Sequence, residues 1–339
     1  MRKPDFDNIL KVLDQKKPGR STLFEYYMND TVYDAYAGKT LSEAERKDPF
    51  IYGKHLIKAF QNAGYDYAHM TGSKFQFQYG HVETAQTRSL NAGFMIVDEE
   101  SYENYRWNDP ENYDYSHLKA LEKELPDGMK LIVSAGESVF GGAARLIGYD
   151  NLCYMLYDDR DLVKEIWQQI GSRMLKYNQI ISQFDSVGAV IVNDDWGFNT
   201  QTMISPDDMR EFVFPWHKKI VETIHAAGKP AILHSCGNLS AVFNDIVDDM
   251  HYDGKHSYQD NICPVEEMYD RWHDKIGIMG GLDVDFLCRS TPEEVRNRSI
   301  KMLEKSADLG GFALGSGNSI ADFVPIENYR AMIEAIQVV

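Results

Sequence analysis

The sequence predicts a closed parallel (β/α)8 barrel of the TIM type. Three observations favour this fold: short β-rich runs alternate with helical patterns, the alternation recurs eight times, and several runs follow a glycine-bearing turn that is typical of a helix C-terminus. The predicted strands span residues 21–27, 65–70, 130–135, 189–194, 231–236, 254–258, 276–283 and 311–315. A doubly wound sheet is the alternative, but no G-x-G-x-x-G fingerprint follows the first strand.

Helical patterns separate the predicted strands. Residues 159–184 place apolar side chains at a spacing that is typical of an amphipathic helix. Ser205 and Thr291 each stand before a proline, which predicts an N-cap and a helix start. We expect residues 1–20 to form a helical lead-in and residues 71–129 an aromatic insertion after the second strand. The 339 residues are interpreted as a single domain.

Composition and charge narrow the functional class. A net charge of −17 and a pI near 5.0 argue against a nucleic-acid partner, because phosphate binding needs clustered Lys and Arg. The apolar runs are too short to cross a membrane, and the N-terminus lacks the apolar core of a signal peptide. Four widely spaced cysteines do not suggest a disulfide framework. These features predict a cytoplasmic protein, and they leave a homodimer open.

The motif His234-Ser-Cys236 at the end of the fifth predicted strand indicates a metal site. Alternate side chains of a strand share a face, so the imidazole and the thiol point the same way. Nitrogen and sulfur ligands are the set that zinc prefers, and catalytic zinc keeps one position open. The alternative is a buried His and a buried Cys that only pack in the core.

Other polar residues stand where predicted strands end, which is where barrel enzymes place their active sites. Glu137, Asp195, His256 and the turn that contains Asn318 are the candidates for further metal ligands. Adjacent residues face opposite sides of a strand, so we expect Asp195 to face the site. Its neighbour Asp194 is then expected to bind loop amides or to cap a helix.

Aromatic residues at the same strand ends predict walls for a substrate. Tyr27, Trp196 and Tyr258 are the candidates for such walls. Three polar residues of the insertion are candidates for lining a lid: His81, Glu83 and Arg88.

From about residue 130 onward the chain is similar to the uroporphyrinogen decarboxylase superfamily. The motifs that carry the resemblance are Gly141-Gly-Ala-Ala-Arg-Leu-Ile-Gly148, Asn193-Asp-Asp-Trp-Gly-Phe, Arg210-Glu-Phe-Val-Phe-Pro215, His234-Ser-Cys-Gly237, Gly280-Gly-Leu-Asp283 and Val324-Pro-Ile-Glu-Asn328. One branch of this superfamily decarboxylates uroporphyrinogen without a cofactor. The other branch contains cobalamin-dependent methyltransferases that hold zinc in a His-x-Cys…Cys pattern.

His234 and Cys236 match the first two positions of that zinc pattern. The third, a cysteine in the last strand's turn, is absent, because the chain reads Gly315-Ser-Gly-Asn-Ser319 there. The decarboxylase branch implies an arginine-rich clamp for the substrate carboxylates, and near the first strand this chain offers only Arg20. A substrate with eight carboxylates is electrostatically unfavourable without that clamp on a chain of net charge −17.

The resemblance therefore implies zinc-assisted methyl transfer from a small methylated donor to a corrinoid (cobalamin) carried by a transient protein partner. Replacement of a soft cysteine ligand by an oxygen favours a methyl ether as the donor. Asp195, Glu137 or His256 would deliver or hold the proton that the departing oxygen requires. The residues that would bind substrate are Tyr27, Trp196, Tyr258 and Asn318. The alternatives are cofactor-free decarboxylation and a barrel that binds a corrinoid or a small molecule without catalysis.

Overall fold

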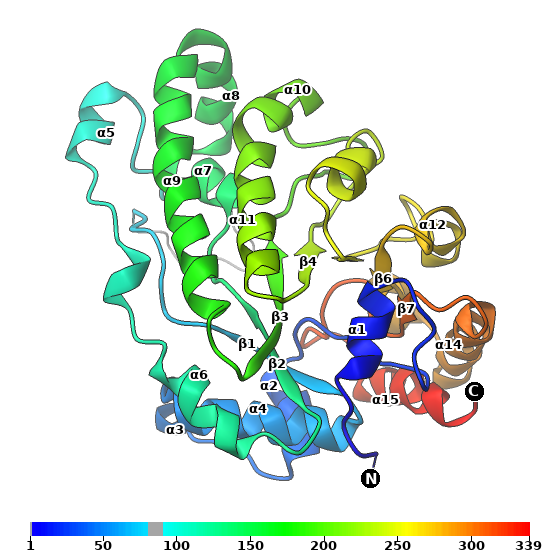
Figure 1. Cartoon of the computed structure of the whole chain (residues 1–339). Helices are drawn as coiled ribbons and strands as arrows, with labels where there is room; N and C mark the ends of the chain where they lie inside the picture. The colour runs from blue at the N-terminus through cyan, green and yellow to red at the C-terminus, as the bar shows by residue number, and fades with distance from the viewer. Residues whose placement is uncertain (1, 81–90) are drawn as a thin grey trace.

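The computed structural model describes residues 2–80 and 91–339. Seven parallel strands form one curved sheet with neighbours in the order β1 to β7 (Figure 1). The strands are β1 (Tyr67–Thr71), β2 (Lys130–Ser134), β3 (Val187–Asn193), β4 (Ala231–His234), β5 (Gly254–His256), β6 (Gly277–Met279) and β7 (Phe312–Ala313). Each parallel pair is joined through a helical crossover, so the helices cover the outside of the sheet.

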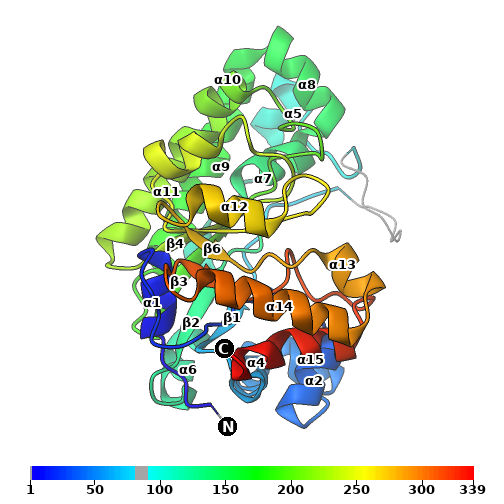
Figure 2. The same cartoon turned by 90° about the vertical axis from the view of Figure 1, so that its right-hand side faces the viewer.

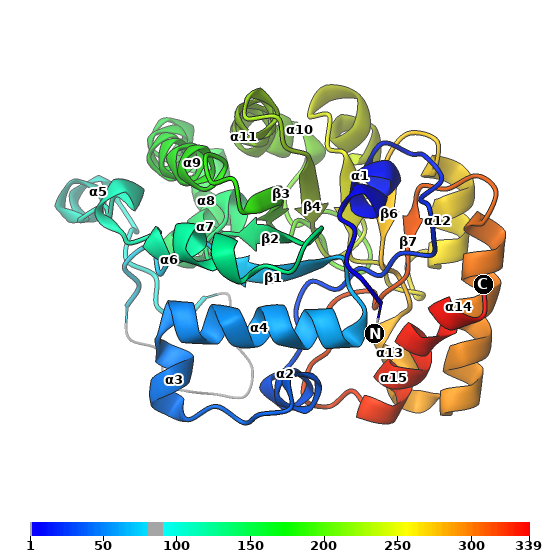
Figure 3. The same ribbon diagram turned by 60° about the horizontal axis from the view of Figure 1, so that its bottom comes forward.

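The helices lie around the outside of the curved sheet, and α4 runs alongside β1 (Figure 3). They are α1 (Asp7–Leu13), α2 (Asp30–Ala37), α3 (Glu43–Lys47), α4 (Pro49–Ala63), α5 (Glu99–Asn104), α6 (Ser116–Leu121), α7 (Val139–Ile147), α8 (Tyr149–Asp158), α9 (Arg160–Ile181), α10 (Pro206–Asp208), α11 (Phe214–Ala226), α12 (Val265–Trp272), α13 (Val284–Arg289), α14 (Pro292–Ser306) and α15 (Ile326–Glu334). Short 3-10 segments are η1 (Pro110–Asn112), η2 (Glu122–Glu124) and η5 (Ala335–Gln337), and η3 (Met209–Val213) and η4 (Asp245–Asp249) are π-helical.

The predicted helix starts are confirmed. Ser205 accepts the N–H of Asp208 at the start of α10. Thr291 forms a reciprocal capping box with Glu294 at the start of α14. Figure 2 shows α14 running alongside α15, near the end of the molecule where both termini lie.

The sheet has seven strands where eight were predicted. Residues 22–28 are extended, but they contribute only isolated bridges, Leu23 to Leu314 and Met28 to Ile320. On the β1 side, the Tyr67 hydroxyl accepts a hydrogen bond from the N–H of Glu25 at 2.6 Å and donates one to the Glu25 carbonyl. A side chain thus takes the place of the main-chain hydrogen bonds that a strand would make there. The parallel α/β architecture is confirmed, but the closed eight-stranded barrel is corrected to seven strands curled as a half-barrel, with an extended segment in place of the first predicted strand.

The first 20 residues and residues 72–129 consist of short helices and irregular segments within the described ranges. The lead-in forms α1, which packs near β6 and β7. The insertion contains α5 and α6 with irregular aromatic segments between them. The predicted lid residues His81, Glu83 and Arg88 lie outside the described residues. Within the described ranges, no helix is both long and apolar enough to span a membrane.

Strand register brings the predicted site residues to one edge of the sheet. His234 is the last residue of β4, and it pairs with Asn193 of β3 on one side and with His256 of β5 on the other. Because all strands are parallel, these three residues lie at the same carboxyl edge.

Candidate metal centre at the carboxyl ends of the strands

Three ligand-type side chains converge just beyond β3 and β4. Nε2 of His234 lies 3.7 Å from Sγ of Cys236 and 4.0 Å from Oδ1 of Asp195. All three donor atoms lie within 4.8 Å of one another. His234 is buried, whereas the Asp195 side chain is 56% exposed, so the cluster opens toward solvent on the carboxylate side.

Two glycine-bearing loops hold this cluster together. Gly237 has a φ of +89°, and a Cβ there would lie 2.1 Å from the backbone carbon and oxygen of Gly197. Only glycine lets the two loops approach so closely in this conformation. The approach brings Asp195 beside Cys236, whose N–H donates to Asp195 Oδ1 at 2.9 Å.

The hydrogen bonds behind His234 determine which ring nitrogen carries its proton. His256 Nε2 lies 3.2 Å from the Ser316 carbonyl, which can only accept, so this nitrogen donates. Burial lowers the pKa of His256 to about 3, so the ring is neutral and its Nδ1 is an acceptor. Nδ1 of His234 lies 2.8 Å from that acceptor and therefore donates to it. Nε2 of His234 is left with its lone pair directed at Cys236 and Asp195.

A buried glutamate, Glu25, contacts this histidine pair through Ser316. The Glu25 carboxyl is hydrogen-bonded to the backbone N–H of Ser316 at 3.2 Å and to the Ser316 hydroxyl at 2.6 Å. Burial raises the pKa of Glu25 to about 8, so the carboxyl is mostly protonated at neutral pH. The Phe24 ring packs edge-on against His256 with centroids 5.0 Å apart. The chain Glu25–Ser316–His256–His234 thus sets the orientation of the imidazole at the site.

The Cys236 sulfur accepts two weak hydrogen bonds. Ser257 Oγ and Asn318 Nδ2 each lie 3.3 Å from Sγ. Ser257 has a φ of +84°, a left-handed conformation that costs energy in a non-glycine residue and that directs its hydroxyl here. Burial, reinforced by the Asp195 charge, raises the pKa of the thiol to about 12. A bound cation would reverse that shift, because metals bind the thiolate.

The donor set fits a zinc ion. A tetrahedral zinc with bonds of about 2.0–2.3 Å to nitrogen, oxygen and sulfur holds its ligand atoms roughly 3.5 Å apart. The separations of 3.7 Å from Nε2 to Sγ and 4.0 Å from Nε2 to Oδ1 are close to that value. His234 offers a free lone pair, and Asp195 and Cys236 supply the negative charge. Three protein ligands leave one position of a tetrahedron for a donor molecule.

Comparison with known proteins identifies the family. The profile described as "Uroporphyrinogen decarboxylase (URO-D)" matches residues 92–339, more than two thirds of the chain. The chain belongs to the uroporphyrinogen decarboxylase family. The predicted resemblance is therefore confirmed at the level of the family.

Curated relatives of this family member carry two different activities in their names. A methylated-thiol–coenzyme M methyltransferase of Methanosarcina mazei is 26% identical over 210 residues, 62% of this chain and 53% of that protein. A uroporphyrinogen decarboxylase of Chlorobaculum parvum is 22% identical over 237 residues, 66% of this chain and 64% of that protein. The matches thus span between half and two thirds of the length of these relatives.

A solved structure supports the fold of this URO-D family member. A methyltransferase from Methanosarcina mazei superposes with a TM-score of 0.71 at 14% identity, covering 98% of this chain and 97% of that one. At this identity the likeness concerns the fold alone.

Asp194 occupies the position that was predicted for it. Its oxygens accept the N–H groups of Phe140 at 2.7 Å and Gly141 at 2.9 Å, at the start of α7. His217 Nε2 lies 2.9 Å from the same carboxylate. Asp194 therefore anchors α7 to β3 and faces away from Cys236, which leaves Asp195 for the metal cluster.

Three other predicted roles are not supported by the geometry. Glu137 is buried, where it accepts the Tyr79 hydroxyl at 2.6 Å and the N–H of Phe77, so it ties the insertion to α7 and does not face the metal cluster. Trp196 has no exposed surface and packs on Phe214, so it cannot form a substrate wall. His256 uses both ring nitrogens within the protein, which leaves none for a substrate proton.

The remaining predicted substrate residues line two separate cavities. Tyr258 and Asn318 line a cavity of about 820 Å³ between the loops after β5 and β7. Its wall also carries Asp260, Asp283 and Asp285 against one cation, Arg289, so the lining is net acidic. Tyr27 lines a different cavity, of about 680 Å³, beside the end of β1. Asn318 connects the first cavity to the cluster through its contact with Cys236.

Proposed function

We propose that this protein transfers a methyl group from a small methylated donor to a corrinoid carried by a partner protein, with zinc held by Asp195, His234 and Cys236. The observation that carries the proposal is the convergence of Nε2, Sγ and Oδ1 at one open edge of the sheet. The methyltransferase relative, 26% identical, supports the same class of reaction.

The proposed transfer moves the methyl group without its bonding electrons. The bond between the methyl carbon and the donor heteroatom breaks, and its electron pair stays on the heteroatom. The acceptor would be the reduced corrinoid of the partner protein, which would supply the electron pair for the new bond to the methyl carbon. A zinc ion held by Asp195, His234 and Cys236 would act as a Lewis acid on the heteroatom and make it a better leaving group. The departing heteroatom then takes a proton from solvent, which reaches the cluster on the exposed side of Asp195.

The ligand set bears on which donor is used. One carboxylate and one thiolate make a harder site than two thiolates, and harder sites favour oxygen ligands. We therefore propose a methyl ether as the preferred donor. The relative is named for a methylated thiol, so a thioether belongs in the same test.

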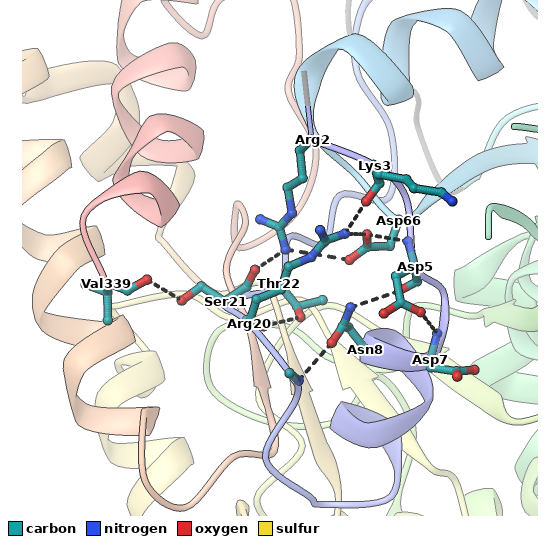
Figure 4. Close-up of polar contacts among 11 residues, drawn as sticks. Arg2, Lys3, Asp5, Asp7, Asn8, Arg20, Ser21, Thr22, Asp66 and Val339 are labelled. Carbon is teal, nitrogen blue, oxygen red and sulfur yellow. Dashed lines mark hydrogen bonds and ion pairs between the residues drawn. The ribbon is translucent and has the colours of Figure 1, made fainter. Parts of the chain in front are cut away.

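Decarboxylation of uroporphyrinogen, the reaction that names the family, is less favourable on this chain. Arg20, the candidate for a substrate clamp, forms an ion pair with Asp66, the residue just before β1 (Figure 4). Its guanidinium also donates to the Lys3 carbonyl at 2.6 Å. Arg20 therefore lies at the amino ends of the strands, opposite the edge that carries His234, and it secures the N-terminal tail.

The test uses the zinc-loaded full chain with free cob(I)alamin as acceptor and two probe donors, an aryl methyl ether and a methyl thioether. We expect methylcobalamin to form, as followed by its absorption spectrum, and His234→Ala to abolish its formation. His251→Asn is the matched control, because His251 is exposed and its φ of 58° is one that asparagine tolerates. Decarboxylation of uroporphyrinogen with no methylcobalamin formed would overturn the proposal, and binding of the corrinoid without turnover would favour the non-catalytic alternative.

A further inference from the structure

The cavity of about 680 Å³ beside β1 has the size of a small-molecule site. It lies between α3 and α4 on one side and the insertion on the other, and the end of β1 forms its floor. Four tyrosines line it: Tyr27, Tyr33, Tyr52 and Tyr113. Tyr27 packs edge-on against Tyr33, and Tyr113 packs edge-on against Phe75, so the aromatic walls are held in place.

The charge of the lining is opposite to that of the chain. Arg46, Lys47 and Lys74 line the cavity, against one carboxylate, Asp114, although the chain as a whole carries −17. Arg46 is held by ion pairs to Asp30 and Asp34. Lys47 forms an ion pair with Glu43 at 2.6 Å. Lys74 Nζ donates to the Lys47 carbonyl at 3.1 Å, and no ion pair with a carboxylate is seen for it among the described residues. Lys74 is therefore the cation available to an incoming anion.

We propose that this cavity binds a single-ring aromatic anion, such as an arene carboxylate, with its negative group at Lys74. Aromatic walls favour a flat ring through edge-to-face contacts, and an ammonium group at the rim selects a negative charge. The cavity of about 820 Å³ after β5 and β7 is less suited to the same ligand, because its lining is net acidic and its one lining cation, Arg289, forms an ion pair with Asp285. The inference goes beyond the proposed methyl transfer and does not depend on bound metal.

The inner end of the cavity lies close to the candidate metal centre. His69 lines the cavity, and the Tyr26 ring lies 4.8 Å from the ring of His69 and 4.5 Å from that of His234. One tyrosine ring therefore separates an occupant of the cavity from a metal-ligand candidate. This arrangement gives an aromatic ligand a short route to the cluster if Tyr26 turns aside.

Isothermal titration calorimetry on the full chain tests the site with four probes: 4-methoxybenzoate, benzoate, neutral methoxybenzene and the non-aromatic cyclohexanecarboxylate. We expect one site for the two aromatic anions and weaker binding of the other two. Lys74→Ala should weaken benzoate binding about tenfold, the effect of losing one charged hydrogen bond. Tyr113→Ala should weaken the binding of both aromatic anions. Lys54→Ala is the matched control, because this half-exposed lysine of α4 does not line the cavity and should leave the dissociation constant unchanged.

His234→Ala separates this inference from the proposed function. It should abolish methyl transfer and leave benzoate binding intact. The inference is overturned if benzoate does not bind, or if Lys74→Ala and Tyr113→Ala bind it as tightly as the wild type. Methyl transfer from a neutral ether with no benzoate binding would support the proposed function and refute the assignment of the cavity as a site for aromatic anions.

Discussion

The Nδ1 atoms of His234 and His256 lie 2.8 Å apart, and only one of them can carry the shared proton. The single proton of the neutral His256 ring is on Nε2, which donates to the Ser316 carbonyl, so the proton between the two Nδ1 atoms belongs to His234. His256 thereby leaves Nε2 of His234 as a lone pair for a metal. It acts on the cluster only through its neighbour, which makes it a positioning residue.

The first prediction concerns this pair of histidines. His256→Phe removes the acceptor for His234 and should lower zinc affinity about 10- to 100-fold, as loss of such an outer partner does at other metal sites. His256→Gln keeps an acceptor oxygen and should lose less. Competition with a chromophoric chelator measures both variants beside His251→Asn. Equal affinity of His256→Phe and wild type would refute the positioning role.

The second prediction concerns the position where a third cysteine is missing. Asn318 Nδ2 lies 3.3 Å from Cys236 Sγ, so a thiol there would stand beside the cluster. Under reducing conditions, Asn318→Cys should tighten zinc binding and roughly double the thiolate-to-cobalt absorption of the cobalt(II) form, because two sulfurs replace one. Ser319→Cys controls for an added thiol next in the chain. An unchanged cobalt spectrum in Asn318→Cys would contradict this placement.

The third prediction concerns the buried Glu25. Burial raises its pKa to about 8 in the folded state from 4.5, so the folded chain holds a proton that the unfolded chain releases. Stability should therefore fall as pH rises from about 4.5 to about 8, by up to roughly 1.4 kcal/mol per pH unit.

Glu25→Gln has no carboxyl to titrate at this position, so its free energy of unfolding should not show this part of the dependence on pH. Urea denaturation of both chains at pH 5, 6.5 and 8 measures the difference, since all other groups are shared. Parallel stability curves for the two chains would show that Glu25 is ionised in the fold.

The fourth prediction concerns Arg20. Arg20→Met leaves the buried Asp66 with only the Asp5 N–H and a longer contact to Arg2, and should cost about 1–3 kcal/mol of unfolding free energy. Donor use should be unchanged, because Arg20 lies at the opposite end of the strands. Chemical denaturation and a donor titration test the two halves. Unchanged stability with lost donor binding would instead place Arg20 at the substrate.

The fold could be predicted from the sequence wherever a buried strand followed a helix and a turn. The seven strands from β1 to β7 each overlap a predicted run. The segment 21–27 has similar apolar content but forms only isolated bridges. Its β1 side is bonded by the hydroxyl of Tyr67, a tertiary contact 42 residues away that no local pattern encodes.

The grouping of candidate ligands could be predicted from the sequence, because it depends on which side chains of a strand share a face. His234, Cys236 and Asp195 follow from period two and from strand ends, whereas the supporting residues do not. Ser257 reaches the sulfur through a left-handed backbone, and Ser316 acts through its carbonyl, which every residue possesses. Trp196 and Glu137 also stand near strand ends, and only their packing shows that they face other elements.

X-ray absorption at the zinc edge, on the purified full chain beside Cys236→Ala, is the most direct test of the metal centre. We predict one sulfur at about 2.3 Å and nitrogen or oxygen neighbours at about 2.0–2.1 Å, with the sulfur shell lost in the variant. A zinc environment without sulfur in the wild type, or one that Cys236→Ala leaves unchanged, would contradict a metal bound by His234, Cys236 and Asp195.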